Sequence, residues 1–541
     1  MINGEGGRIA EETRVENVMD RVETTITVWL GLTMGCTKCH DHKFDPLTMR
    51  DYYGLYDVFN QTSEDGLGRS GQAAPALDLA TAEEKARFEK ADATFRAVVK
   101  DINEYETTRF GKPPGEERTK VPQVAGYPGK LTQFLGRQAP DKRSADNLLE
   151  CIAQLTKLND KDYAGRLQKL LNTLKARTSA LANVTKVMVM DTVPKMRETF
   201  VLEKGAYDKA STTKVSFNVP ASLPALKADA PRNRLGLAEW IVNRDNPLTA
   251  RVTVNRFWQA FFGVGLVKTA EDFGLQGEVP VHRELLDWLA SEFIDSGWDV
   301  KALMRLIVTS ETYHQSSKIA DAQVDPENRY LARGPRFRMP SWMLRDQALF
   351  VAGLLGDKLG GPSVKPYQPE GIWEEATFGK KSYVQDHGDA LYRRTLYIFW
   401  RRIVGPTMLF DNSARQTCVI KATRTNTPLQ ALVTLNDVTY VEAARALAQR
   451  VLLANRGQED AALAQAFRLV TCRDPAKAEE ALLKTHLGKL RAQQSADRAA
   501  AMKLLAVGES KRDESIDAIE HATWTSLCLM LLNLDETVTK E

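Results

Sequence analysis

Large apolar residues recur at intervals of three and four along most of this chain of 541 residues. That spacing places them on one face of an α-helix, so each such segment needs a partner to cover its apolar side. Short alternating stretches, which are typical of β-strands, stand out near the middle of the chain, over 186–193 and 197–205. The pattern predicts a mainly α fold: a multi-helical two-domain protein with a few short strands near the domain connector.

Three regions follow one another along the chain. They are a first module over 1–65, a helical hairpin insertion with a strand- and Pro-rich connector over 66–230, and a helical C-terminal domain over 231–541. In the second region, Thr81 and Glu84 have the spacing of a capping box, which predicts that a helix begins there. The Pro and Gly residues over 111–141 predict an irregular loop.

One short motif carries most of the chemical information in this sequence. Cys36, Cys39 and His40 form a Cys-x-x-Cys-His pentapeptide, the pattern of covalent haem c attachment. Two thiols three residues apart can bond the two vinyl groups of one haem, and the adjacent imidazole can bind the iron as its proximal ligand. The sequence therefore predicts one haem c, held by these three side chains.

Two other interpretations of the motif stay open. A structural zinc site needs four ligands, and the chain has no second Cys-x-x-Cys and no His-x-x-x-His to complete a set. A thioredoxin-like redox pair would follow a strand in a βαβ pattern, whereas a helix-like apolar segment precedes Cys36.

The ligand on the other side of the iron cannot be identified from spacing. Met190 and His282 are weak candidates, because a Met in an alternating stretch is more often a core residue and His282 has the position of a helix start. His42 is too close to His40 to reach the opposite face, so we expect a hydrogen-bonding loop residue. Asp41 and Asp45 flank it; they could bind a cation through oxygen, or stabilise a turn.

Composition excludes several classes of protein. The 73 basic and 70 acidic side chains leave a net charge of only +3, so nucleic acid is not an expected partner. No apolar run reaches about 18 residues, which predicts that this chain has no transmembrane segment. The first 21 residues also lack the apolar core of a signal peptide.

Several other reactive or polar residues have plain structural explanations. An Asp-Phe-Gly triplet at 272–274 lacks the accompanying motifs of a protein kinase. Buried Arg and Asn side chains of the C-terminal half predict a polar network between helices, with binding of an anionic or sugar substrate as the alternative: Arg251, Asn255, Arg256, Arg415, Arg424 and Asn426. Four scattered cysteines are expected to be buried free thiols, although a disulfide is possible in an exported protein: Cys151, Cys418, Cys472 and Cys528.

Long stretches of the chain resemble a known family. Residues 14–60, which contain the Cys-x-x-Cys-His motif, are similar to the cytochrome-like module of a large exported family found chiefly in Planctomycetes and Verrucomicrobia. The C-terminal half resembles the second, Planctomycete-specific module of that family, most clearly over 233–267, 272–317 and 424–437. Both modules are of unknown function, and the chain resembles a member that is truncated at its N-terminus.

The resemblance implies a haem and a location more than a reaction. It implies haem c on Cys36 and Cys39 with His40 as proximal ligand, and a periplasmic or cell-surface protein in its full length. Family members often have His where this chain has Ala260, Phe261 and Phe200, so those positions cannot supply the distal ligand here. The expectation is an exported mono-haem protein that exchanges electrons with a redox partner protein. The alternatives are an extracellular enzyme acting on polysaccharide through its C-terminal domain, or a structural cell-surface protein.

Overall fold

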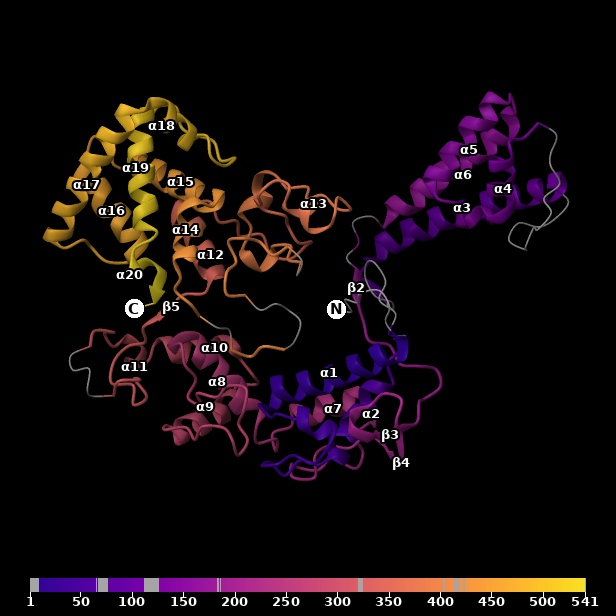
Figure 1. Cartoon of the computed structure of the whole chain (residues 1–541), viewed down its shortest axis with the longest axis horizontal. Helices are drawn as coiled ribbons and strands as arrows, with labels where there is room; N and C mark the ends of the chain where they lie inside the picture. The colour runs from indigo at the N-terminus through magenta and orange to yellow at the C-terminus, as the bar shows by residue number, and fades with distance from the viewer. Residues whose placement is uncertain are drawn as a thin grey trace. The chain divides into compact units, whose positions relative to one another are not determined.

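The computed structural model describes residues 9–64, 66, 76–110, 126–181, 184, 186–319, 325–401, 404–412, 418–421 and 424–540. Contacts between residues divide the chain into two compact units (Figure 1). Residues 68–191 form one, here called the inserted unit, and residues 2–67 and 192–541 form the other, here called the main unit. Helices dominate both, which confirms the predicted mainly α class.

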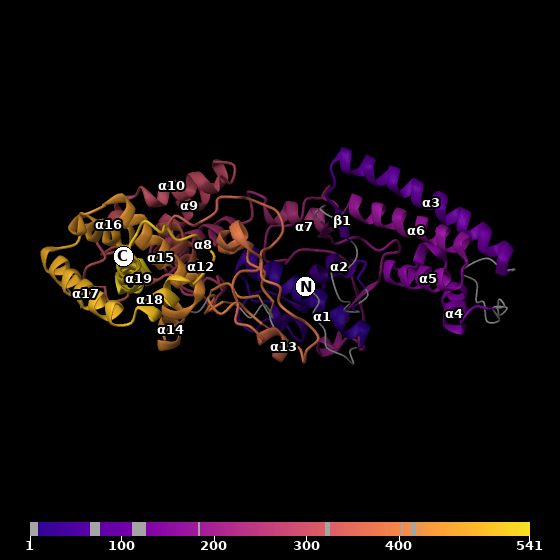
Figure 2. The same cartoon turned by 90° about the horizontal axis from the view of Figure 1, so that it is seen from above.

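The inserted unit is a helical bundle with a short two-stranded ribbon. Its elements are β1 (Ala76–Asp78), α3 (Ala82–Phe110), α4 (Gly129–Arg137), α5 (Ala145–Lys157), α6 (Lys161–Ala180) and β2 (Lys186–Met188). Figures 1 and 2 show α3, α5 and α6 lying side by side, and β1 pairs antiparallel with β2. The predicted capping box is present at the start of α3, where the Glu84 amide donates to Thr81 Oγ1 and the Thr81 amide donates to the Glu84 carboxylate.

One prediction for this unit was wrong in part. The Pro- and Gly-rich stretch 111–141 was expected to be an irregular loop, yet α4 lies within it. Pro128 precedes the first residue of α4, where its fixed φ does no harm, and Leu131 and Leu135 of the helix are buried. The apolar spacing of this short helix therefore outweighs the breakers around it. Residues 111–125 of the stretch lie outside the described residues.

The N-terminal part of the main unit surrounds the Cys-x-x-Cys-His motif. It comprises α1 (Ala10–Leu30), a 3-10 turn η1 (Gly35–Lys38), α2 (Met49–Asn60), β3 (Thr199–Leu202), β4 (Ala210–Val215) and α7 (Arg234–Ile241). Their apolar faces share one core, which includes Val22, Leu30, Tyr52 and Trp240. The predicted strands near 186–193 and 197–205 are thus present as β2 and β3.

The rest of the main unit is almost entirely helical. Its elements are α8 (Thr249–Phe262), α9 (Arg283–Asp295), α10 (Val300–Val308), α11 (Glu311–His314), β5 (Phe337–Arg338), α12 (Ser341–Ala352), α13 (Ile372–Ala376), α14 (Pro428–Asn436), α15 (Val438–Ala454), α16 (Glu459–Thr471), α17 (Lys477–Ala496), α18 (Arg498–Leu505), α19 (Ala518–Leu531), α20 (Asp535–Val538) and β6 (Thr539–Lys540). A core of aromatic and aliphatic residues joins α8, α9 and α10, and a second core joins α12, α15, α16, α17 and α19. None of the helices described is long and apolar enough to cross a lipid bilayer.

Candidate functional site: the Cys36–His40 segment

A single tight turn carries the two cysteines of the motif. Helix α1 ends at Leu30, and its C-cap Gly31 adopts a left-handed conformation with φ of 60°, which glycine tolerates best. Four residues later the chain forms η1, and the amides of Cys39 and His40 both donate to the carbonyl oxygen of Cys36, at 3.1 and 3.3 Å. Buried Thr37 donates its hydroxyl to the Met34 carbonyl at 2.6 Å. These bonds fix both thiols on one turn.

The three side chains of the motif are all accessible. Cys36 and Cys39 are free and exposed, and His40 is exposed as well. His40 Nδ1 lies 2.8 Å from the carbonyl oxygen of Asp41. A carbonyl oxygen can only accept, so Nδ1 is the donor in this bond, which leaves Nε2 as the metal-binding nitrogen of the neutral imidazole. The imidazole is therefore oriented with one nitrogen available to a metal.

This donor set fits a covalently attached haem. The attachment needs two unbonded thiols close together in sequence and an adjacent imidazole, and it benefits when a backbone carbonyl fixes the second ring nitrogen of that imidazole. Cys36, Cys39 and His40 meet these requirements. A zinc site is less well served, because no three His, Cys, Asp or Glu side chains among the described residues converge to hold a metal ion.

Polar contacts from α1 and α2 hold the turn in place. The Tyr53 hydroxyl has one proton to donate, and the backbone oxygens of Lys38 (3.0 Å) and Leu202 (3.4 Å) are both within hydrogen-bonding distance of it. Burial raises the pKa of Tyr53, so its phenol stays neutral and keeps the proton that it donates. Lys38 Nζ in turn pairs with Glu23 Oε1 of α1 at 2.9 Å. The turn is thereby attached to α1, α2 and the end of β3.

The loop after the motif is held by its own side chains. As expected of a hydrogen-bonding loop residue, His42 accepts the Asp45 amide on Nδ1 at 2.9 Å. Asp41 accepts the Met49 amide on Oδ1 at 2.8 Å, and Asp45 accepts the Leu275 amide on Oδ1 at 2.7 Å. Both carboxylates thus accept backbone amides, but from 8 and 230 residues away and not within the local turn that was the predicted alternative to a cation site.

The two weak candidates for a distal iron ligand remain predictions. Met190 lies in the inserted unit just after β2, with 47% of its surface exposed. His282 lies in the main unit immediately before α9, as expected of a helix-start residue, and its Nε2 is 3.2 Å from the Arg329 carbonyl oxygen.

Polar residues of α8 support the structural interpretation of the predicted network. Arg251 pairs with Asp287 of α9 at 2.6 Å, and Arg256 donates to the Thr27 carbonyl of α1 at 2.9 Å. Fully buried Asn255 bonds the backbone of Val267 twice, accepting its amide and donating to its carbonyl.

The second half of that predicted set is only partly described. The Arg424 guanidinium lies over the Phe337 ring at 4.4 Å, and Asn426 is exposed. Arg415 lies outside the described residues.

The prediction for the four scattered cysteines was wrong for two of them. All four are free thiols, and Cys151 and Cys528 are buried as expected. Cys418 and Cys472 are exposed. Cys472 follows the last residue of α16 in a left-handed conformation with φ of 61°, so it ends a helix instead of filling a core.

Sequence reasoning missed a buried carboxylate at Glu442 of α15. This side chain accepts the hydroxyls of Tyr367 (3.0 Å) and Tyr392 (2.8 Å) and the amide of Ser510 (2.5 Å). Burial, followed by the bond to Glu442, raises the pKa of Tyr392. A carboxylate with all these donors is satisfied inside the protein, so it fastens three loops together. Its partners are 50 to 75 residues away in sequence, and no local pattern marks them.

One small cavity, lined by residues of α12, α14, α15 and α20, has no charged lining. Gln347 Oε1 and the Tyr440 hydroxyl are buried at it without a hydrogen-bond partner in the described chain. Its lining residues are Leu344, Gln347, Ala348, Thr434, Tyr440, Leu532, Thr537 and Val538. This cavity does not supply the paired carboxylates that hydrolysis of a polysaccharide would use.

Comparison with known protein families gives two matches along the chain. Residues 1–64 match the model PSCyt2, a protein of unknown function (DUF1549), and residues 233–487 match the model PSD1, a protein of unknown function (DUF1553). The chain belongs to a two-module, planctomycete-type family of unknown function. The predicted resemblance is thereby confirmed in both its modules and their order. No curated protein and no solved structure matches the chain.

The two matched regions correspond to particular elements of the main unit. The PSCyt2 module contains α1, the Cys36–His40 segment and α2, whereas the PSD1 module begins at Asn233, the N-cap of α7, and ends within α17. The inserted unit lies between the two matched regions. Neither family has an assigned function.

Proposed function

We propose that the PSCyt2 module binds one haem c covalently through Cys36 and Cys39, with His40 as the proximal iron ligand, and that the protein exchanges electrons with a redox partner protein. The observation that carries the proposal is the state of the motif. Two free, exposed thiols lie on one turn, beside an imidazole whose Nδ1 is occupied by the Asp41 carbonyl. A bound haem would supply one-electron chemistry.

Each residue has a definite part in this proposal. The thiols of Cys36 and Cys39 would each add across a vinyl group of the haem; a carbon–sulfur bond would form, the S–H bond would break and its proton would end on the neighbouring vinyl carbon. No oxidant or reductant is consumed. His40 would bind the iron through Nε2, the ring nitrogen opposite the one that bonds the Asp41 carbonyl, and the Tyr53 hydroxyl holds the turn through the Lys38 carbonyl.

The proposal includes a location outside the cytoplasmic membrane. Haem c is attached there, and free thiols persist in such an oxidising compartment only when they are protected or reacted. Attachment would convert Cys36 and Cys39 into thioethers that can no longer form a disulfide. We therefore propose a periplasmic or cell-surface protein.

The test is expression of the full chain, fused to an export signal, in cells that contain the haem c maturation machinery. We expect one haem per chain in a pyridine haemochrome assay, with the absorption of a haem joined by two thioether bonds. Cys36→Ala combined with Cys39→Ala should abolish the covalent haem. Cys472→Ser is the matched control, because it removes an exposed free thiol elsewhere in the main unit. Equal haem in the double variant and in the control would refute the proposal.

A further inference from the structure

One loop of the PSD1 module contacts both ends of the segment that carries the haem-binding motif. The Phe273 amide donates to the carbonyl oxygen of Gly31 at 2.7 Å, and the Leu275 amide donates to Asp45 Oδ1 at 2.7 Å. Gly31 precedes Cys36 and Asp45 follows His40. The two donors are only two residues apart, so a single stretch of backbone joins the start and the end of the segment. We call these two hydrogen bonds the clasp.

The clasp leaves no space for side chains at two glycines. A Cβ atom at Gly31, whose φ is 60°, would lie 2.8 Å from Cδ2 of Phe273, and a Cβ atom at Gly274 would lie 2.5 Å from Asp45 Oδ2. Real Cβ atoms do not approach other atoms this closely, and a left-handed φ adds strain for any other residue. At each of these glycines the backbone of one module therefore packs directly against a side chain of the other.

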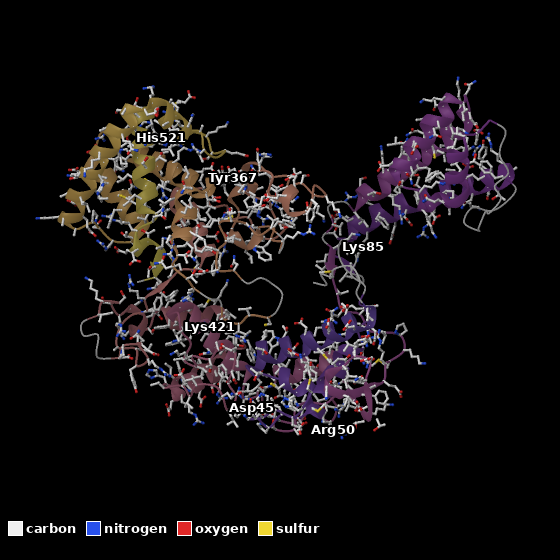
Figure 3. The ribbon with its side chains drawn as sticks, in the orientation of Figure 1. Asp45, Arg50, Lys85, Tyr367, Lys421 and His521 are labelled. Atoms are coloured by element: carbon white, nitrogen blue, oxygen red, sulfur yellow. The ribbon has the colours of Figure 1, made fainter. Side chains whose placement is uncertain are left out.

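Burial of the Asp45 carboxylate at this position is energetically unfavourable. Only 3% of the Asp45 side chain is exposed, and its Oδ2 atom lies 3.5 Å from Nδ1 of His42. Oδ2 accepts no hydrogen bond from the described part of the chain. A buried carboxylate with an unsatisfied oxygen destabilises the fold that contains it. Such a local conflict is expected at functional positions more than elsewhere. Figure 3 labels Asp45 where the ribbon of the N-terminal module meets the ribbon of α8 and α9.

The PSD1 side of the clasp is a loop that its own hydrogen bonds make rigid. Asp272 Oδ1 accepts the Gly274 amide at 2.8 Å, and the Asp272 carbonyl accepts the Thr269 hydroxyl at 2.8 Å. Thr269 Oγ1 also accepts the Glu278 amide at 3.0 Å. Just before the loop, Val267 is bonded to buried Asn255 of α8. The loop can therefore serve as a fixed template for the segment that it contacts.

From Asp45 the contacts continue toward the motif. The Asp45 amide donates to His42 Nδ1 at 2.9 Å, and the His42 amide donates to the Leu47 carbonyl at 2.8 Å. His42 is two residues from His40. A displacement of Asp45 would therefore be passed to the backbone next to the proximal histidine.

We propose that the Asp-Phe-Gly loop at 272–274, with Leu275, is a positioning element of the PSD1 module that fixes the Cys36–His40 segment, and that Asp45 is its positioning residue. The two modules then form one site, because the conformation of the motif in the first depends on backbone donors from the second. The clasp itself is independent of any cofactor; its effect on haem rests on the function proposed above.

The clasp is tested by hydrogen exchange at residue resolution in the full chain without haem. Asp45→Ala removes the acceptor of the Leu275 amide. Faster exchange of that amide alone is expected with or without a positioning role, so it does not test the proposal. The proposal requires more: the amides of Phe273, Cys39 and His40 should also exchange about fivefold faster, as expected when a bond worth about 1 kcal/mol is lost from a shared structure. Asp45→Asn keeps Oδ1 as an acceptor and should restore the slow exchange.

Matched variants separate this effect from general damage. Asp41→Ala removes a carboxylate that accepts the Met49 amide and takes no part in the clasp, so it should leave the Phe273 amide unchanged. Gly274→Ala should reproduce the effect of Asp45→Ala, whereas Gly488→Ala introduces a methyl group with no atom within 4 Å and should have none. Exchange within α15 and α19 reports whether each variant is folded.

The outcomes distinguish this inference from the proposed function. Faster exchange confined to Leu275 in Asp45→Ala would overturn the clasp, whatever the haem content. If the parent chain takes up no haem but the amides respond as expected, the clasp stands and the proposed function fails. If both hold, Asp45→Ala should carry less haem per chain than Asp45→Asn under the same maturation conditions. Equal haem content in these two variants would show that the clasp does not affect haem attachment, and would overturn its positioning role.

Discussion

His521 provides a pH dependence that can be worked out from its surroundings. This side chain on α19 is fully buried, its Nε2–H donates to the Arg445 carbonyl at 3.0 Å, and its Nδ1 accepts from Arg512 Nε at 3.3 Å. Burial lowers the pKa of His521; the bond to Arg445 and the charge of Asp513 oppose this change, and the charges of Arg512 and Arg445 reinforce it. A proton added at Nδ1 would face a guanidinium group that now donates to that atom.

The sign of the effect follows from linkage. The folded state keeps His521 neutral at a pH where the unfolded chain, with a pKa near 6.5, already binds a proton. The contribution of His521 to stability is therefore fully present above about pH 6.5 and is lost as the pH falls toward the lower pKa of the folded state. If the folded imidazole stays neutral throughout, the free energy of unfolding falls by about 1 kcal/mol between pH 6.5 and pH 5.5.

The measurement compares the parent chain with His521→Gln at both pH values. Urea unfolding, followed by hydrogen exchange within α19, reports the main unit without interference from the inserted unit. His521→Gln cannot bind a proton, so its loss of stability between the two pH values should be about 1 kcal/mol smaller than that of the parent chain. His314→Gln, which removes an exposed imidazole on α11, is the control. An identical pH dependence in the parent chain and His521→Gln would refute the reasoning.

Three further substitutions test a buried ion pair, a buried hydroxyl and a helix cap. Arg143→Met leaves Glu106 buried without its bidentate partner, whose two bonds are 2.6 and 2.8 Å, and should lower the free energy of unfolding of the inserted unit by about 3–5 kcal/mol in urea; adding Glu106→Leu should recover much of this loss, and additive effects would contradict a shared pair. Tyr440→Phe removes a buried hydroxyl without a partner among the described residues and should raise the free energy of unfolding by about 1 kcal/mol; a loss of that size would mean that the hydroxyl is hydrogen-bonded. Asn233→Ala removes the acceptor for two amides at the start of α7 and should cost about 1 kcal/mol by the same measurement, whereas an unchanged midpoint would show that this cap contributes nothing.

The sequence predicts what depends on neighbouring residues. The helices around the motif follow from apolar spacing, and the thiols and imidazole of residues 36–40 follow from their order alone. The same reasoning correctly identified His42 as a hydrogen-bonding loop residue, because its bond to the Asp45 amide spans only three residues.

The remaining features depend on pairings that no local pattern contains. Asp45 could be recognised as a turn residue, yet its partner Leu275 is 230 residues away. The Asp-Phe-Gly triplet could be dismissed as a kinase motif, but its contact with Gly31 appears only once the two modules are folded together. The exposure of Cys418 is likewise a property of the tertiary fold.

The residues that flank the inserted unit lie next to each other in the main unit, which affects how such chains can change during evolution. Within the main unit, Thr62 and Thr192 form an antiparallel bridge, the Val193 amide donates to the Gln61 carbonyl at 2.9 Å, and Arg197 binds the carbonyls of Asn60 and Thr62. The chain thus leaves and re-enters the main unit at one place, which is the geometry that tolerates domain insertion. A segment of any length between these residues could be exchanged, shortened or deleted during evolution without altering the register of α2 or β3.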